Sequence, residues 1–309
     1  MNKTKIDWCD MSWNPVTGCL HGCPYCYART MAHRFGNKFE NYGNSPKVLD
    51  KPWTSNGPCE DDWRVNPYPY GFAPTFHRYR LEEPEREKRP KNIFAVSMGD
   101  LFGSWVPYEW IRDIFAECER APWHRYLFLT KNPNGIDKFM DGDSGEERGY
   151  EESIEFFAPF WFGTTVTCAA DIERANILTN LREGHRFLSI EPLLGPVNLN
   201  FEKDRCPECG SDEIYEDNPR TRGDASALYC DDCGWEGNNR SELKPSIEWV
   251  IVGAETGKRN GRIIPQRSWI KDIVNQCRAS GVSIFMKNSL SGIWGEPLIQ
   301  EFPWEAHDD

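Results

Sequence analysis

The sequence has no long apolar run. Nowhere in its 309 residues do about 18 consecutive apolar residues occur, which is roughly the length that a membrane-spanning helix needs. Residues 1–7 also lack the apolar core of a secretory signal peptide. We therefore expect a cytoplasmic protein without a membrane span.

Basic residues are the minority among the charged ones. The chain has 36 Lys and Arg against 48 Asp and Glu, which gives a formal net charge of −12. Nonspecific binding to nucleic acids depends on basic patches that release counterions, so this charge argues against a protein that coats polyanions. It leaves room for a local basic groove on an acidic surface.

The twelve cysteines are not expected to form a disulfide framework, because disulfides are rare in cytoplasmic proteins. Seven of them fall into two tight groups, a pattern typical of metal binding. The other five are scattered along the chain: Cys9, Cys59, Cys118, Cys168 and Cys277.

The first group has the spacing C-x3-C-x2-C and consists of Cys19, Cys23 and Cys26. Three thiolates leave one coordination position of a bound metal centre without a protein ligand. A [4Fe–4S] cluster held in this way has one free iron that a small molecule can occupy. The alternative is a closed structural zinc site, which needs a fourth ligand.

Three residues are candidates for that fourth ligand: His21, Cys9 and Cys59. His21 lies inside the cysteine-rich stretch and has a simpler interpretation as a polar loop residue. A colourless protein with two zinc ions per chain would favour the closed site over an iron–sulfur cluster.

The second group consists of two C-x2-C pairs separated by twenty residues, Cys206 with Cys209 and Cys230 with Cys233. A glycine follows the second cysteine of each pair, as the tight turn of a zinc knuckle favours. This pattern predicts a four-cysteine zinc ribbon over residues 198–246, with an auxiliary iron–sulfur cluster as the alternative. Its expected role is to stabilise an inserted loop, and contact with a substrate is a second interpretation.

Strand and helix patterns alternate through the rest of the chain. We predict a first strand near 12–16 and then strands at 92–97, 125–130, 160–167, 186–190, 247–252 and 282–286. The predicted helices are 27–35, 107–119, 136–140, 170–183 and 267–279. This alternation predicts an α/β fold with a parallel sheet. Six or seven units over about 250 residues suggest a partial (β/α)6-like TIM barrel.

The barrel is expected to comprise residues 1–197 and 247–309, with the ribbon inserted between them. Residues 37–91 show little periodicity and many prolines and aromatic residues. A long stretch of this kind inside a compact domain is commonly functional. We interpret it as a lid segment over the mouth of the barrel.

Polar residues recur where the predicted strands end: Asp100, Lys131, Glu191, Glu255 and Lys287. Strand ends are often simply polar. Because the carboxyl ends of parallel strands carry the active sites of α/β proteins, the recurrence favours a shared site at this rim.

Together these motifs resemble the radical S-adenosylmethionine superfamily, and the whole chain resembles the phage and bacterial "three-Cys-motif" family of radical-SAM-like proteins. The matching stretches are Lys5–Trp8, Trp13–Cys19, Ser97–Phe102, Leu129–Pro133, Leu188–Gly195 and Trp249–Gly257. The zinc ribbon lies outside the family's core. Thr167-Cys168 departs from the acidic or amide residue expected at that strand end.

The resemblance implies a set of cofactor ligands. Cys19, Cys23 and Cys26 would bind a [4Fe–4S] cluster whose fourth iron is chelated by S-adenosylmethionine. Tyr25 would lie beside the adenine. The stretch Met98-Gly99-Asp100 would hold the methionine amino group, with Lys131 as a further cofactor contact. Glu191 and Glu255 are candidates for binding ribose or substrate.

The implied reaction is reductive cleavage of S-adenosylmethionine to a 5′-deoxyadenosyl radical, which abstracts a hydrogen atom from the substrate. It requires an external electron donor, such as a flavodoxin- or ferredoxin-like protein. A three-Cys-motif partner protein is also implied. We favour a nucleic-acid base or nucleotide as substrate, with a peptide or small molecule as the alternative. Cys168 is a candidate hydrogen-atom donor or, more simply, a small apolar filler.

Overall fold

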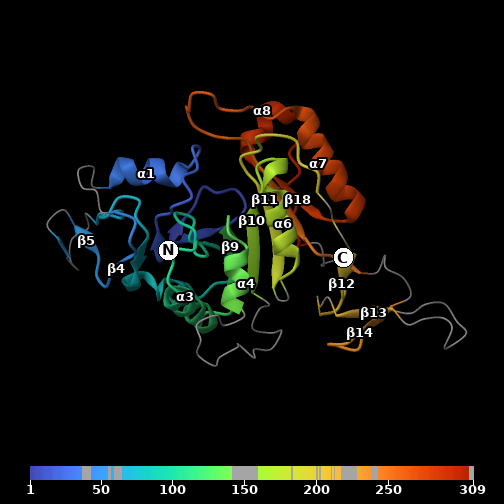
Figure 1. Ribbon diagram of the computed structural model, residues 1–309, viewed down its shortest axis with the longest axis horizontal. Coiled ribbons are helices and arrows are strands. Elements are labelled where there is room, and N and C mark those ends of the chain that lie inside the picture. The colour runs from blue at the N-terminus through green and yellow to red at the C-terminus, as the bar shows by residue number, and fades with distance from the viewer. Residues whose placement is uncertain are drawn as a thin grey trace, which may run out of the picture. The chain divides into compact units, whose positions relative to one another are not determined.

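The computed structural model describes residues 1–36, 43–54, 57–58, 65–140, 159–181, 184–199, 201, 203–209, 211, 213–216, 228–237 and 243–305 (Figure 1). The chain divides into two compact units. The first unit comprises Met1–Glu152 with Pro159–Thr164, and the second comprises Ser153–Ala158 with Thr165–Asp309.

The first unit contains a mainly parallel sheet in the order β1-β2-β8-β9-β10. Its strands are β1 (Asn2–Lys3), β2 (Met11–Trp13), β8 (Asn92–Ala95), β9 (Arg125–Thr130) and β10 (Phe160–Thr165). Only the edge strand β1 is antiparallel to its neighbour, whereas the other pairs run parallel. The carboxyl ends of β2, β8 and β9 therefore lie at the same edge of the sheet.

The described residues of the first unit form the helices α1 (Tyr27–Phe35), α2 (Glu83–Arg86), α3 (Tyr108–Arg120) and α4 (Asn134–Met140) and the 3-10 helix η1 (Arg78–Arg80). Helix α1 ends at Gly36, where a Cβ atom would lie 2.6 Å from the Ala32 carbonyl oxygen and 2.7 Å from that of Tyr68. Only glycine fits this close approach of two backbone segments.

The predicted lid segment contains more regular structure than its sequence pattern indicates. Its described parts include β4 (Lys47–Leu49), β5 (Trp53–Thr54), β6 (Gly57–Pro58) and β7 (Thr75–His77), and β7 pairs with β4 and with β3 (Val16–Thr17). Strands of two or three residues are too short to leave a period-two pattern, which explains why the sequence reads as irregular. The lid role stays a prediction.

Aromatic rings form the core of the first unit. Phe115 of α3 stacks on Phe128 of β9 with a ring-centroid distance of 5.0 Å. It also contacts Phe139 of α4 at 4.7 Å and Phe160 of β10 at 5.0 Å. Phe115 is fully buried, so one side chain joins two helices to two neighbouring strands.

The second unit has a parallel three-stranded sheet in the order β11-β17-β18, formed by β11 (His185–Ile190), β17 (Trp249–Val252) and β18 (Ser283–Met286). Its helices are η2 (Ala169–Asp171), α6 (Ile172–Thr179), α7 (Arg267–Ser280), η4 (Asn288–Leu290) and α8 (Ser291–Trp294). Trp249 is buried at its centre, between the rings of Phe187 and Phe285 on the flanking strands.

The predicted ribbon region forms short antiparallel strands within the second unit. β12 (Lys203–Arg205) pairs with β16 (Lys244–Pro245), and β14 (Leu228–Cys230) pairs with β13 (Ile214–Glu216) and β15 (Glu236–Gly237). The structure thus confirms a mixed α/β protein with a mainly parallel sheet and a separate four-cysteine element. In neither unit do the described strands close into a barrel, so the partial barrel stays a prediction.

Among the helices that the structure describes, none is both long enough and apolar enough to span a membrane.

Replacing Phe115 with alanine should remove the contacts that join α3 and α4 to the sheet. We expect the free energy of unfolding to fall by about 3–5 kcal/mol, because the cavity left by a buried phenylalanine collapses only in part. Urea unfolding followed by circular dichroism measures this loss. Val48→Ala, at a residue that is 42% exposed, is the control and should cost less than about 0.5 kcal/mol. Equal midpoints for both variants would contradict the assignment of Phe115 to the core.

Candidate functional site

The cysteine loop, residues 19–26, begins at the carboxyl edge of the first unit's sheet. Gly18 precedes it and forms an isolated parallel bridge with Gly99, while the Gly18 N–H donates to the Met98 carbonyl oxygen at 3.0 Å. Gly18 has φ of +87°, and a Cβ atom there would lie 2.3 Å from the Ala73 carbonyl oxygen. The loop therefore starts from a position that only glycine can occupy.

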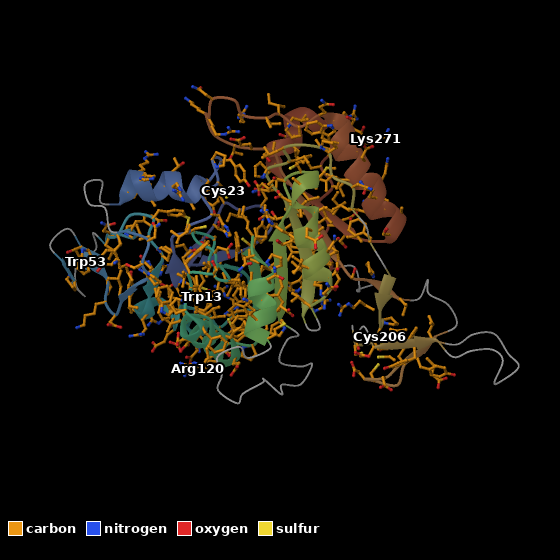
Figure 2. All side chains as sticks on the ribbon, in the orientation of Figure 1. Trp13, Cys23, Trp53, Arg120, Cys206 and Lys271 are labelled. Atoms are coloured by element: carbon orange, nitrogen blue, oxygen red, sulfur yellow. The ribbon has the colours of Figure 1, made fainter. Side chains whose placement is uncertain are left out.

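The loop ends at the amino terminus of α1, and Cys23 lies just before the first turn of that helix (Figure 2). Cys26 is the N-cap residue, and its Sγ accepts a hydrogen bond from the Arg29 N–H at 3.3 Å. The Arg29 guanidinium donates to the Cys19 carbonyl oxygen at 3.3 Å. A helix amino terminus and a cation thus both lie beside the loop and favour negative charge there.

The Cys19 thiol is protonated at neutral pH in the metal-free chain. Burial raises the pKa of Cys19 to about 12, and the nearby Asp100 carboxylate and the other two cysteines act in the same direction. The backbone N–H of His21 opposes the shift without cancelling it. A bound metal centre would supply the positive charge that ionises the Cys19 thiol.

Asp100 joins the cysteine loop to the sheet. It follows β8 and is 4% exposed. Its Oδ2 accepts hydrogen bonds from His21 Nε2 at 2.7 Å and from the Lys131 N–H at 2.9 Å. Its Oδ1 accepts from Thr130 Oγ1 at 2.6 Å and from the Phe102 N–H at 3.2 Å. Asp100 thus accepts four hydrogen bonds from the protein itself, whereas the resemblance implied that it holds the methionine amino group of the cofactor.

The charge on Asp100 is retained in spite of its burial. Burial alone would raise the pKa of Asp100, but the hydrogen bonds from His21, Lys131 and Thr130 outweigh it and hold this pKa below its usual range. The carboxylate is therefore ionised at neutral pH and fixes the orientation of the His21 ring within the cysteine loop.

The turn between β8 and Asp100 is strained. Val96 has φ of +59°, a conformation that a β-branched residue rarely adopts and that costs about 1–3 kcal/mol. Its N–H nevertheless bonds the Trp13 carbonyl oxygen at 2.7 Å, and Asn14 Oδ1 accepts from the Met98 N–H at 2.9 Å. These bonds hold the turn so that Gly99 lies against Gly18 and Asp100 reaches His21.

Lys131 and Tyr25 also come together at this edge. The Lys131 ammonium lies 5.8 Å from the centre of the Tyr25 ring, within range of a cation–π interaction. The first unit therefore gathers the predicted residues Cys19, Cys23, Cys26, Tyr25, Met98, Gly99, Asp100 and Lys131 around one loop.

Two buried donors near the loop lack an acceptor. Arg29 Nε and Trp105 Nε1 are both inaccessible to solvent and bond no acceptor in the described chain. The Trp105 ring packs edge-on against His21 at 4.8 Å, and it covers Gly103, where a Cβ atom would lie 2.4 Å from the ring. Buried N–H groups without acceptors are costly, so their presence here fits a bound group that carries acceptor atoms.

The second unit carries the other predicted rim residues. Lys287 follows β18 and donates to both carboxylate oxygens of Glu191, which follows β11, at 2.6 and 2.7 Å. The pair spans the end of the intervening strand β17, where Gly253 lies. A Cβ atom at Gly253 would lie 3.0 Å from the Glu191 Cδ atom, so a larger residue at this position would crowd the Glu191 side chain of the ion pair.

Glu255 and Cys168 lie elsewhere in the second unit. Glu255 is 6% exposed and makes two hydrogen bonds with the Arg259 guanidinium, at 2.6 and 2.7 Å. The Arg259 bond holds the pKa of Glu255 below its usual range. Cys168 is half-buried, precedes η2, and lies beside Gly195, where a Cβ atom would be 3.2 Å from the Cys168 Cβ.

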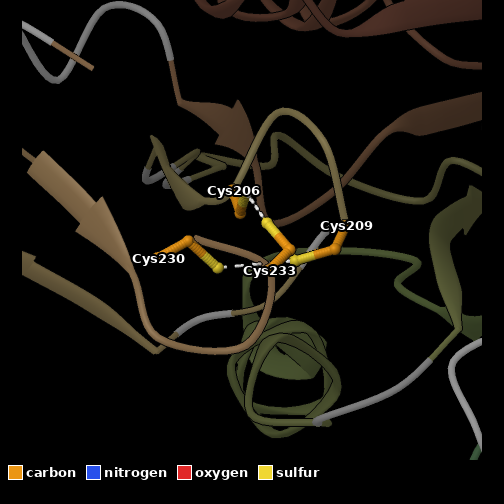
Figure 3. A group of neighbouring side chains, drawn as sticks. All are labelled: Cys206, Cys209, Cys230 and Cys233. Carbon is orange, nitrogen blue, oxygen red and sulfur yellow. Dashed lines mark hydrogen bonds between the residues drawn. The ribbon is translucent and has the colours of Figure 1, made fainter. Parts of the chain in front are cut away.

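The second cysteine group forms a compact site that could hold a metal ion such as zinc. The sulfur atoms of Cys206, Cys209, Cys230 and Cys233 all lie within 4.8 Å of one another and point toward a common centre (Figure 3). The Sγ–Sγ distances are 3.6 Å for Cys206–Cys233 and 3.5 Å for Cys209–Cys230. Four thiols around one point are the donor set of a closed structural site.

Backbone turns hold these thiols in place. The Cys206 N–H donates to the Ser211 carbonyl oxygen at 2.8 Å, and the Gly234 N–H donates to that of Cys230 at 2.9 Å. Gly234 has φ of +74°, which explains the glycine after the second pair. Next to Cys206, the buried Arg205 guanidinium donates to the carbonyl oxygens of Thr179 and Leu181 at 2.7 and 2.8 Å. The site is thereby attached to the end of α6.

A family model with the description "Protein of unknown function (DUF5131)" matches residues 3–301. The chain belongs to this family. Comparison with curated proteins and with solved structures gave no match. Family membership assigns no reaction to the DUF5131 chain, so its function is inferred from its own residues.

The two cysteine groups of the DUF5131 chain differ in geometry. Within the described residues, the ribbon cysteines are the one group of three or more Cys, His, Asp or Glu placed to hold a metal ion, and their sulfur atoms all lie within 4.8 Å of one another. Cys19, Cys23 and Cys26 form no such group, with or without His21. Of the other proposed ligands, Cys59 lies outside the described residues, and Cys9 precedes β2 rather than joining the loop.

Several residues that organise the DUF5131 site were absent from the sequence-based prediction. Thr130 acts through its hydroxyl, Phe102 through its backbone N–H and Asn14 through its amide oxygen, and no local sequence pattern predicts these hydrogen bonds. His21 is a candidate metal ligand from the sequence, and in the structure it bonds Asp100. Its position between Cys19 and Cys23 is the sequence feature that indicates a role in shaping the loop.

Asp100→Asn should destabilise the first unit and loosen the cysteine loop. An amide offers one acceptor oxygen, so two of the four donors would face an NH2 group, at a cost of about 2–4 kcal/mol. Urea unfolding measures the loss, and mass spectrometry after brief alkylation of the metal-free chain measures access to Cys19. Asp113→Asn on α3, which breaks only an exposed pair with Arg112, is the control. Equal stability and equal alkylation of both variants would exclude the anchor role.

Cys209→Ser should abolish metal binding by the ribbon of the DUF5131 chain. A structural metal contributes its binding free energy to folding, so we expect the loss of one metal ion per chain and faster proteolysis within 198–246. Elemental analysis of the purified variant measures the metal content. Cys168→Ser, which removes a half-buried thiol outside both groups, should keep the parental content. A full metal complement in Cys209→Ser would contradict this assignment.

Proposed function

We propose that the protein is a radical S-adenosylmethionine enzyme whose [4Fe–4S] cluster is bound by Cys19, Cys23 and Cys26. The observation that carries the proposal is the contrast between the two cysteine groups. The ribbon thiols converge on a point suited to a single ion, whereas the loop thiols form no single-ion group within the described residues. A polynuclear cluster needs thiolates that are spread around a larger body, and three of them leave one iron open.

The surroundings of the loop support an anionic group with acceptor atoms. The Arg29 N–H bonds Cys26 Sγ, and the buried Nε of Arg29 and Nε1 of Trp105 have no acceptor in the described chain. Donors of this kind stabilise the sulfur atoms of a cluster and raise its reduction potential. Arg29 and Trp105 are therefore assigned to tuning and covering the cluster.

The chain's own residues would position the cofactors. Asp100 holds His21 and thereby the middle of the cysteine loop, while Lys131 lies over Tyr25. When bound, the cluster and S-adenosylmethionine supply an electron and a 5′-deoxyadenosyl radical for hydrogen abstraction. Met98 and Gly99 lie beside Gly18 at the start of the loop and remain the candidates to contact the methionine part of the cofactor.

The second unit would provide further polar groups. Glu191 with Lys287 and Glu255 with Arg259 form two charge pairs that could bind ribose or substrate hydroxyls. Cys168 is the candidate hydrogen-atom donor. The ribbon cysteines are proposed to hold structural zinc. The electron would come from a cytoplasmic flavodoxin- or ferredoxin-like donor, and a three-Cys-motif partner protein is proposed as well. The proposed substrate is a nucleic-acid base or nucleotide, with a peptide or small molecule as the alternative.

One observation favours a second candidate function, a non-catalytic metal-binding protein. A histidine that binds a metal commonly donates its other ring N–H to a carboxylate, as His21 Nε2 can to Asp100. His21 Nδ1 would then complete a site with the three loop cysteines. A mononuclear site of this type requires the four ligand atoms to close around one ion, and among the described residues the group placed in this way is the ribbon group.

Anaerobic purification and reconstitution with iron and sulfide separates the two candidates. We expect a brown protein with about four irons per chain in addition to one zinc, and formation of 5′-deoxyadenosine from S-adenosylmethionine after reduction with dithionite. Cys23→Ala should lose the colour, the iron and the product.

Cys168→Ala is the matched control, because it should keep the iron and the reductive cleavage of S-adenosylmethionine while testing the donor role of Cys168 in substrate turnover. A colourless chain with two zinc ions would overturn the proposed function in favour of the metal-binding alternative. Retention of full iron content by Cys23→Ala would exclude the loop as the cluster site.

A further inference from the structure

A pocket of about 480 Å³ lies in the first unit, and of its lining residues only Met98 has a role in the proposed chemistry. It lies between α1, the edge of the sheet at β1 and β2, and the turn that follows β8. Its volume is within the range of about 300–1,000 Å³ typical of small-molecule sites. Tyr27 directly follows Cys26, and Met98 directly precedes Gly99, so the pocket borders the ends of the cysteine loop.

Aromatic and sulfur-containing side chains form one wall of this pocket. Tyr27, Met31 and Phe35 recur every four residues on one face of α1 and are 52%, 39% and 50% exposed. The Tyr27 hydroxyl donates to the Ser97 carbonyl oxygen at 2.7 Å, which fixes its ring across the gap between helix and sheet. Tyr68 adds a further ring. Exposed rings of this kind offer flat apolar faces to a planar ligand.

The lining of the pocket includes the largely buried amide of Asn14, whose orientation is fixed. Asn14 is 6% exposed, and its Oδ1 accepts hydrogen bonds from Ser97 Oγ at 3.1 Å and from the Met98 N–H at 2.9 Å. These bonds fix the orientation of the amide, with its Oδ1 toward Ser97 and Met98 and its NH2 group on the other side. An oriented amide donor of this kind selects a ligand with acceptor atoms on its edge.

The charge of the pocket differs from that of the whole protein. Its lining includes Lys5 and Arg80 but no Asp or Glu, in a chain whose formal net charge is −12. Arg80 is held by Glu83 through two hydrogen bonds. Lys5 is exposed and makes no ion pair with the described residues. Its ammonium is therefore available to an anionic group on a ligand.

We propose that this pocket binds a nucleotide, with the base between the aromatic wall and the Asn14 amide and a phosphate near Lys5. The three features match the three parts of such a ligand: a planar heterocycle, edge acceptors and an anion. The proposal does not require radical chemistry, although the pocket shares Met98 with the proposed cofactor site. The nucleotide can be free or part of a single strand, and the experiment distinguishes these two sources.

Isothermal titration calorimetry on the full-length protein tests the proposal with AMP, GMP, CMP and UMP, with the corresponding nucleosides, and with single-stranded hexanucleotides. We expect saturable binding of at least one nucleotide, and binding of its nucleoside that is weaker by about three- to tenfold. A hexanucleotide that binds at least tenfold more tightly than the mononucleotide identifies a strand as the source, and equal affinities identify a free nucleotide.

Variants locate the binding. Phe35→Ala should weaken nucleotide binding by tenfold or more, because stacking on the ring is lost. The ring is half exposed, so its removal should not unfold the protein. Asn14→Asp keeps the acceptor for Ser97 and Met98 but removes the amide donors, and it should weaken binding to a similar extent. Lys5→Gln should weaken binding of the nucleotide and leave the nucleoside unchanged. Tyr215→Ala removes an equally exposed ring from the ribbon and should have no effect.

Three results would overturn the proposal: no saturable binding by any nucleotide or nucleoside, unchanged affinity in both Phe35→Ala and Asn14→Asp, or displacement of the nucleotide by S-adenosylmethionine. The last result would make the pocket part of a cofactor site. Loss of iron in Cys23→Ala with unchanged nucleotide affinity would support the independence of the two sites.

Discussion

The carboxylate of Asp100 is the interaction on which the geometry of the first unit's site depends. A buried charge is tolerated only when hydrogen bonds replace its hydration, and Asp100 receives four. The donors come from the end of β9, from the turn after β8 and from the cysteine loop. If any of these segments moved, the buried Asp100 carboxylate would lose a hydrogen bond. The sheet edge and the cysteine loop therefore hold each other in place.

The two cysteine groups show how the same residue serves two different purposes. In the ribbon, backbone turns bring four sulfur atoms around one point, and the attachment of Arg205 to the end of α6 links that point to the second unit. In the loop, the thiols are shaped by a helix amino terminus, by Arg29 and by the His21–Asp100 bond. The ribbon thiols surround a single point without other groups. The loop thiols lie beside hydrogen-bond donors and a cation, which would stabilise a larger, anionic centre.

Locally encoded elements could be predicted from the sequence, and long-range contacts could not. The bounds of α1 and β9 agree with the prediction, because Gly36 ends the helix and Arg125–Thr130 is a continuous β-rich run. The strands β3, β4 and β7 are too short to leave a periodic pattern. The His21–Asp100 pair joins residues 79 positions apart, and Gly253 is explained only by the Glu191–Lys287 pair that passes over it. Nothing in a local window encodes such contacts.

The net charge of a chain is a limited guide to what it binds, for a physical reason. Charges separated by more than about 8 Å are largely screened at physiological ionic strength, so the formal charge of −12 mainly repels extended polyanions. A bound ligand responds instead to the few groups within a screening length. Around the loop these are the cations of Arg29 and Lys131 and the carboxylate of Asp100, and in the α1 pocket the exposed cation is Lys5. The proposed binding of a small anion therefore depends on these local groups and not on the net charge of the chain.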